Sequence, residues 1–124
     1  MVEHTIVEHP ACLVVRLRGS LDAYLRDFTP EVEKKLRGRP RDLVLNLSGI
    51  DFIGSRGMGL LFHLHKLLRD MGRRLIVAAP SAPVRDALEV GGIGSLLELR
   101  ESEDAAVAEL SGGGSTGPRP TRRK

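Results

Sequence analysis

Aromatic side chains are scarce in this sequence, which contains no Trp, one Tyr and three Phe among 124 residues. The core must therefore be built from Leu, Val, Ile and Ala, and the 41% share of apolar residues is sufficient for a packed globular domain. Few rings are present on which unpaired bases could stack. This scarcity argues against a protein that binds single-stranded nucleic acid.

Cysteine is also rare: Cys12 is the only one, so no disulfide can form within the chain. It lies in the apolar run 11–15, where a buried small side chain is expected. The start of the chain lacks the basic and apolar segments of a signal peptide. No apolar stretch approaches the roughly 20 residues of a membrane-spanning helix. We therefore expect a soluble, cytoplasmic protein without membrane insertion.

Motifs for metal binding and catalysis are missing as well. The sequence has no cysteine pair, no His-Glu-x-x-His on a helix and no glycine-rich loop for phosphates. His63 and His65 are two positions apart on a predicted helix, so they do not face each other and form a poor metal pair. We therefore expect no metal, no cofactor and no enzymatic activity.

The basic residues are unevenly distributed, although the formal net charge is +3. Four of the 19 lie in the last six positions, and residues 1–110 hold 15 basic and 16 acidic residues. Residues 111–124, which are otherwise Gly, Ser, Thr and Pro, are too polar to pack. The prediction is a nearly neutral domain over residues 1–110, a disordered basic tail over 111–124, and no nucleic-acid partner.

Apolar patterns and turn residues divide residues 1–110 into strands that alternate with helices. Thr29 with Pro30 is typical of a helix start, as is Ser102, whereas Gly38 and Gly72 are typical of helix ends. Residues 48–57 are expected to form a tight connection. The alternation indicates an α/β domain with one central sheet. The predicted strands span residues 2–7, 11–18, 42–47, 74–79 and 96–99, and the predicted helices span 29–37, 57–71, 81–90 and 102–110.

The most informative segment is residues 52–59, Phe-Ile-Gly-Ser-Arg-Gly-Met-Gly, between a buried strand and a helix. Ser55 falls at or near the helix N-cap, where a hydroxyl accepts a backbone hydrogen bond worth about 1 kcal/mol. Gly57 and Gly59 each cost the helix up to about 1 kcal/mol relative to Ala, but they allow a backbone or a ligand to approach closely. Two interpretations stay open. The segment is either a capped tight turn alone or a turn whose exposed hydroxyl is also switched by phosphorylation, since a helix N-terminus tolerates an anion.

The helix that follows carries two rows of side chains. Met58 and Phe62 lie in the second row, with His65 and Arg69. Three alternatives stay open for Met58 and Phe62: an exposed docking surface beside Ser55, packing under the third helix, or a contact that closes a homodimer. The first row is a core stripe at helical period, formed by Gly57, Leu60, Leu61, Leu64, Leu67, Leu68 and Met71.

Four segments, in their order and spacing, resemble a STAS domain of the anti-sigma factor antagonist type over residues 2–110. They are residues 18–22, residues 43–48, the motif 52–59 and residues 72–75. The resemblance implies a four- to five-stranded mixed sheet with about four helices. It also implies a partner, an anti-sigma factor that is a serine kinase and that the antagonist binds to release a sigma factor.

The motif of that family, Asp-Ser-Ser/Thr-Gly-Leu-Gly, implies the site residues. Its first Ser is the phosphoacceptor and matches Ser55, and Asp22 matches the family's acidic residue beside it. Gly54 stands where the family has Asp, and Arg56 stands where it has the second Ser/Thr. These departures keep a second hypothesis open, a non-phosphorylated scaffold subunit of a stress-sensing or lipid-transport ATPase complex. The implied partner-binding residues are Asp22, Gly54, Ser55, Arg56, Gly57, Met58, Gly59 and Phe62.

Overall fold

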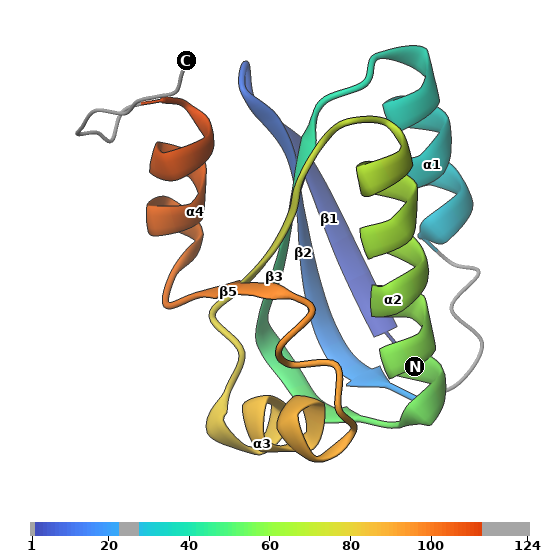
Figure 1. Cartoon of the computed structure of the whole chain (residues 1–124), viewed down its shortest axis with the longest axis vertical. Helices are drawn as coiled ribbons and strands as arrows, with labels where there is room; N and C mark the ends of the chain where they lie inside the picture. Colours follow the sequence, from blue (N-terminus) through green and yellow to red (C-terminus); the bar gives the residue numbers. More distant parts are fainter. Residues whose placement is uncertain (1, 23–27, 113–124) are drawn as a thin grey trace.

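Five strands and four helices make up the described part of the chain (Figure 1). The structure is a computed structural model that describes residues 2–22 and 28–112. The tail predicted for residues 111–124 therefore lies outside the described residues from residue 113 onward. In chain order the elements are β1 (Val2–Glu8), β2 (Cys12–Leu21), α1 (Thr29–Gly38), β3 (Asp42–Ile53), α2 (Ser55–Asp70), β4 (Leu75–Ala78), α3 (Ala82–Val90), β5 (Glu98–Arg100) and α4 (Glu103–Leu110).

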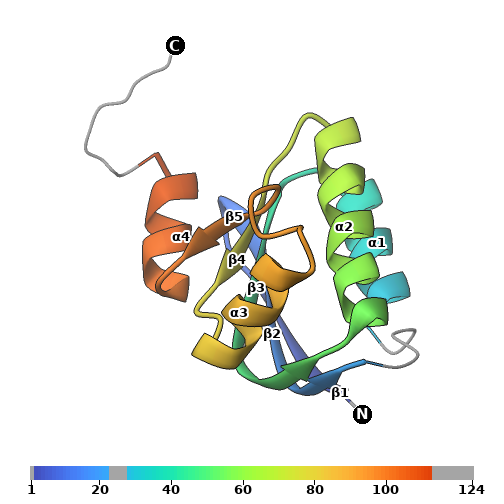
Figure 2. The ribbon, with the colours of Figure 1, turned by 60° about the horizontal axis from the view of Figure 1, so that its bottom comes forward.

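The strands form one mixed sheet in the order β1-β2-β3-β4-β5, and Figure 2 shows them side by side. β1 runs antiparallel to β2 because a tight turn connects them, in which His9 and Cys12 exchange backbone hydrogen bonds of 3.0 and 3.3 Å. The remaining pairs are parallel, and each of their connections contains a helix. Right-handed crossovers in a sheet built in chain order place these helices on one face. The predicted α/β domain with a mixed sheet is confirmed.

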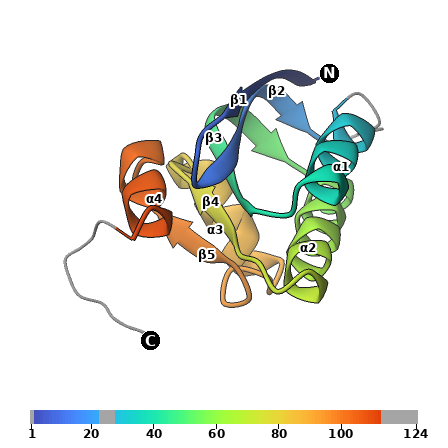
Figure 3. The same cartoon turned by 90° about the horizontal axis from the view of Figure 1, so that it is seen from above.

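The helices cover the two faces of the sheet unequally. α1 and α2 lie on one face and α4 lies on the other, as Figure 3 shows. The larger core cluster joins the sheet to α1, α2 and α3, which contribute residues such as Val32, Leu64 and Leu88. β2 supplies side chains to both faces because its residues alternate. The smaller cluster lies under α4 and consists of Cys12, Val14, Val44, Ile76, Ala78 and Ala106. Cys12 is buried there, as predicted.

β2 and β3 are longer than the sequence predicts. β2 continues to Leu21 and β3 to Ile53, so residues 48–53 of the predicted tight connection belong to a strand. Their pairing contains two register shifts, each of which places an extra residue in β3. At the first shift a Cβ on Gly49 would lie 2.8 Å from the carbonyl oxygen of Leu17, so glycine is needed there. The shifts interrupt the regular alternation of side chains, which explains why the sequence pattern did not reveal the extension.

The predicted helix starts and ends are close to the observed ones. α1 begins at Thr29, although its N-cap is Phe28 rather than Thr29. The Ser102 side chain caps α4 as predicted, because it accepts a hydrogen bond from the Ala105 N–H at 3.0 Å. Gly72 follows α2 with a φ of 72°, a conformation that glycine adopts without strain. Local side-chain chemistry therefore predicts most of these boundaries to within one or two residues.

Candidate functional site

The motif recognised in the sequence lies where β2 and β3 end and α2 begins. Asp22 follows β2 directly, and Gly54 separates β3 from Ser55, the first residue of α2. The two strand ends are joined because the Gly54 N–H donates to the carbonyl oxygen of Leu21 at 2.9 Å. The fold therefore brings Asp22 next to the segment that carries Ser55.

Gly54 is half-buried between two side chains. A Cβ at this position would lie 3.2 Å from the Cβ of Asp22, which is tighter than ordinary packing, and 3.5 Å from the ring of Phe52. A larger side chain would crowd Asp22, and a carboxylate would also repel it electrostatically. Gly54 therefore lies in close contact with Asp22 and Phe52, and a larger side chain would require Asp22 to shift by a few tenths of an ångström.

Ser55 is exposed in the first turn of α2. Gly54 is the N-cap, and its carbonyl oxygen accepts the first helical hydrogen bond from the Met58 N–H at 3.0 Å. Ser55 therefore lies next to the N-cap, but the prediction that its hydroxyl caps the helix is wrong, because no side-chain hydrogen bond caps α2. Its side chain makes no hydrogen bond to another described residue. The hydroxyl is thus accessible to a partner.

Gly57 and Gly59 have different environments despite their proximity in the sequence. Gly57 is buried, and a Cβ there would collide with the carbonyl oxygen of Leu21 and lie 2.9 Å from Cγ1 of Ile53. Gly59 is exposed, and a Cβ there would have no atom within 4 Å outside its own helix turn. The missing side chain of Gly57 therefore makes room for the backbone of β2. Only the missing side chain of Gly59 makes room for a partner.

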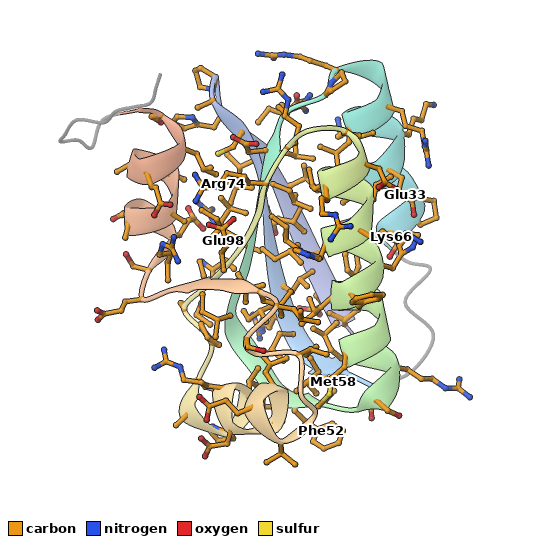
Figure 4. The ribbon with its side chains drawn as sticks, viewed as in Figure 1. Glu33, Phe52, Met58, Lys66, Arg74 and Glu98 are labelled. Carbon is orange, nitrogen blue, oxygen red and sulfur yellow. The ribbon has the colours of Figure 1, made fainter. Side chains whose placement is uncertain are left out.

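Met58 and Phe62 also differ. Met58 is half-buried beside the end of α3, where a Cβ on Gly91 would collide with its sulfur (Figure 4). Phe62, one turn further along α2, has 48% of its surface exposed. Of the alternatives open from the sequence, packing under the third helix describes Met58, and an exposed surface describes Phe62.

The surface position of Phe52 was not predicted from the sequence. Its ring lies over Gly54, and 53% of its surface is exposed. Phe52 therefore forms part of the border of the site around Ser55, together with Asp22. The only sequence signal that Phe52 belongs to the site was its position in the motif. Because residues 48–57 were expected to form a turn, the side on which its ring lies was not predictable. Its exposure follows from the continuation of β3 to Ile53.

A group of ion pairs lies around α4, on the other face of the sheet. Arg100 and Arg74 both donate hydrogen bonds to Glu109, and these bonds, led by that from Arg100, lower the pKa of this carboxyl to about 2. At the start of α4, Arg16 and Asn46 donate to Glu103 and lower its pKa. These contacts attach α4 to the sheet.

The side chains that surround Ser55 are suited to contact with another molecule. Asp22, at the end of β2, and Arg56, the next residue along α2, are both exposed.

Within residues 2–22 and 28–112, no group of three or more His, Cys, Asp or Glu side chains is arranged to hold a metal ion. None of the described helices is long and apolar enough to cross a membrane.

Comparison with protein families assigns this arrangement. A sequence model of the STAS domain matches residues 3–106, which extend from β1 into α4 and include the whole site. The chain belongs to the STAS domain family. The resemblance inferred from the motif and its flanking segments is thereby confirmed.

Related STAS proteins are similar over most of their length. The anti-sigma F factor antagonist of Paenibacillus polymyxa is 28% identical over 104 residues, which are 82% of this chain and 89% of the relative. The anti-sigma-F factor antagonist RsfA of Mycobacterium tuberculosis is 24% identical over 107 residues, or 84% of each chain. The unphosphorylated anti-sigma factor antagonist SpoIIAA shares the fold, with a TM-score of 0.77 and 21% identity over 89% of this chain and 97% of SpoIIAA.

Proposed function

We propose that this STAS protein is an anti-sigma factor antagonist, which binds an anti-sigma factor and thereby releases a sigma factor. The observation that carries the proposal is the accessible Ser55 hydroxyl in the first turn of α2, next to open Gly59 and exposed Phe62. The names of the related proteins support it, because they are antagonists of the same kind and are similar over most of their length. The proposed role requires binding and no chemistry by this chain.

The proposed contact surface is smaller than the set of residues implied by the motif. Asp22, Ser55, Arg56, Gly59 and Phe62 are exposed and would contact the anti-sigma factor directly. The half-buried Gly54 and Met58 would contribute their accessible edges. Gly57 is buried against β2, so we assign it to the placement of the first turn rather than to the contact.

We propose further that the partner is a serine kinase and that it phosphorylates Ser55. A phosphate would add about −1.5 to −2 charges at the start of α2, where the free N–H groups and the helix dipole tolerate an anion. The fold would therefore survive the modification. The contact would not, because a charged and hydrated group would stand at the centre of a surface that must be desolvated on binding.

The second candidate is a scaffold subunit that docks through the same surface without phosphorylation. Arg56 favours it, because a guanidinium beside Ser55 would pair with a phosphate and reduce its repulsive effect. Gly54 favours it as well, because no carboxylate stands at that position to contribute to recognition by a kinase. The two candidates share the docking surface and differ in whether Ser55 is switched.

Binding experiments with purified proteins test the proposal. The anti-sigma factors encoded by the source organism are titrated one by one, in a calorimeter, against wild type, Ser55→Ala and Ser55→Glu. Ser48→Glu is the matched control, because Ser48 is exposed in β3. We expect binding of one anti-sigma factor by wild type and by Ser55→Ala, and a loss confined to Ser55→Glu. Wild type that binds none of them would refute the antagonist function.

The switch is tested separately by mass. Incubation with the bound anti-sigma factor and ATP should add one phosphate to wild type and none to Ser55→Ala, as measured by intact mass spectrometry. No added phosphate, together with unchanged affinity of Ser55→Glu, would refute the switch and favour the scaffold. The docking surface would then stand without it.

A further inference from the structure

The exposed face of α2 carries an excess of positive charge. This excess contrasts with residues 1–110 as a whole, which hold 15 basic and 16 acidic residues. Only one acid, Asp70, lies on α2. Arg73, also exposed, follows directly after the helix. Beyond Ser55, the exposed residues of α2 are Arg56, Gly59, Phe62, His63, Lys66, Arg69 and Asp70.

Three of these cations outnumber the one acid beside them, Asp70. Lys66, Arg69 and Arg73 make no ion pair with any described residue. The nearby acid of α1, Glu33, is already engaged by His63 at 3.1 Å and by Arg37 at 3.4 Å. Elsewhere in the described residues many arginines contact a carboxylate, as in the pairs Arg16–Glu103, Arg41–Glu8, Arg74–Glu98 and Arg100–Glu109.

An exposed aromatic ring stands in the same row as the unpaired cations. Phe62, Lys66 and Arg69 are spaced i, i+4 and i+7, so they lie on one side of the helix. Gly59, one turn before Phe62, leaves this row open at its start. Figure 4 shows Lys66 further along α2 than Met58, away from α3. The row therefore continues the Ser55 surface along the helix.

Solubility and the helix dipole account for part of this pattern only. Arg69 lies in the last turn, where a cation stabilises the helix. Lys66 lies before that turn, and neither effect explains a half-exposed Phe62 between Gly59 and Lys66. An aromatic ring beside uncompensated cations is instead typical of a contact surface, in which aromatic residues are enriched at the centre and charges select the partner.

We propose that the docking surface extends from Ser55 along the row Gly59, Phe62, Lys66 and Arg69, and that it binds an acidic surface of the anti-sigma factor with an apolar patch for Phe62. This inference rests on the proposed function, because it specifies the chemistry of that partner. Charge complementarity carries it: Lys66 and Arg69 form no ion pair with a described residue and, with Arg73, outnumber the one neighbouring acid, Asp70, so the partner supplies further acids.

The distance along α2 limits how far a phosphate on Ser55 would act on an acidic partner docked over the row. Lys66 and Arg69 lie about 17 and 21 Å from Ser55 along the helix, which is at least twice the Debye length of about 8 Å at physiological ionic strength. A phosphate at Ser55 would therefore act mainly on the part of the partner that contacts Ser55, because salt largely screens it from charges docked over Lys66 and Arg69. The switch at Ser55 and the attraction along the row are therefore separate contributions to binding.

Charge reversal at one position, with a matched control, tests the inference. Lys66→Glu is compared with Lys34→Glu, because Lys34 is also a helical lysine without an ion pair to any described residue. Lys34 lies on the side of α1 opposite the buried Val32 and Leu36, away from α2. Both variants change the net charge equally. The thermal unfolding of both variants should match that of wild type. A third variant, Phe62→Ala, tests whether the ring binds an apolar patch of the partner.

Affinity for the purified anti-sigma factor is measured at low and high salt. At about 50 mM NaCl we expect Lys66→Glu to weaken binding at least about tenfold and Lys34→Glu less than about twofold; the difference should shrink at about 500 mM NaCl because salt screens the attraction. Equal affinities of the two variants, or wild-type affinity that does not depend on salt, would overturn the inference while the antagonist function stands. Wild type that binds no anti-sigma factor would overturn both.

Discussion

Replacement of Gly57 by alanine isolates the contact that places the first turn of α2 against the end of β2. The added Cβ would collide with the carbonyl oxygen of Leu21 and approach Cγ1 of Ile53 to 2.9 Å. A backbone oxygen cannot rotate away as a flexible side chain does. The helix and the strand must therefore separate, which would also displace Ser55 from Asp22.

The magnitude follows from two opposing effects. Overpacking of a filled site typically costs about 1–3 kcal/mol, so about 2–3 kcal/mol is expected for a collision with backbone. Alanine regains up to about 1 kcal/mol of helix propensity relative to glycine. The net destabilisation should be about 1–2 kcal/mol. For a domain of this size, a change of about 1 kcal/mol shifts the melting temperature by about 4 °C, so Tm should fall by about 4–8 °C.

Gly59→Ala provides the control, because it is the same substitution in the same helix and only the tertiary surroundings of the glycine differ from those of Gly57. Its Cβ would meet no atom within 4 Å, so the propensity gain is unopposed and Tm should rise by up to about 4 °C. Both variants are unfolded by heat and followed by far-UV circular dichroism, since the chain contains no Trp for fluorescence. If Gly57→Ala were as stable as Gly59→Ala, the close approach of Leu21 to α2 would be wrong.

Two further predictions concern α4 and the cluster beneath it. Because hydrogen bonds from Arg100 and Arg74 hold the pKa of Glu109 at about 2, its contribution to stability is complete above the ordinary pKa of 4.5 and is lost as the pH falls toward 2. Between pH 5 and 2, the free energy of unfolding of wild type should therefore fall by about 1–2 kcal/mol more than that of Glu109→Gln in urea titrations, after allowance for a carboxyl that is one-third exposed. Equal decreases in the two proteins would contradict the role of the hydrogen bonds from Arg100 and Arg74 to Glu109. Cys12 is fully buried, and burial is the main cause that raises its pKa. Its thiol should therefore react with a thiol reagent only when α4 or the whole domain opens, so that added urea should accelerate labelling. Rapid labelling of the folded protein would contradict the burial of Cys12.

The order of strands and helices follows from local patterns in the sequence. Apolar period, Pro30 at a helix start, the Ser102 cap and the Gly72 turn depend on contacts within a few residues, and each agrees with the structure. The core stripe of α2 was predictable for the same reason: Leu61, Leu64 and Leu68 are buried. The sequence predicted Ser55 at or near the N-cap of a helix beginning at residue 57, because the motif joins a strand pattern to a helix pattern, and α2 begins two residues earlier, at Ser55.

Contacts between distant residues decided what local patterns left open. β3 extends to Ile53 because β2 pairs beside it through two register shifts, and Phe52 is consequently a surface residue. Met58 is half-buried because Gly91 leaves room for its sulfur.

The sequence by itself determined that a serine begins a helix in a small α/β domain, because helix starts and apolar periods are local properties. Only the tertiary structure distinguished Gly57 from Gly59: one faces the carbonyl oxygen of Leu21 and the other faces open space. The two residues are chemically identical and belong to the same helix. Their difference arises from the strand that the fold places against one side of that helix and not the other.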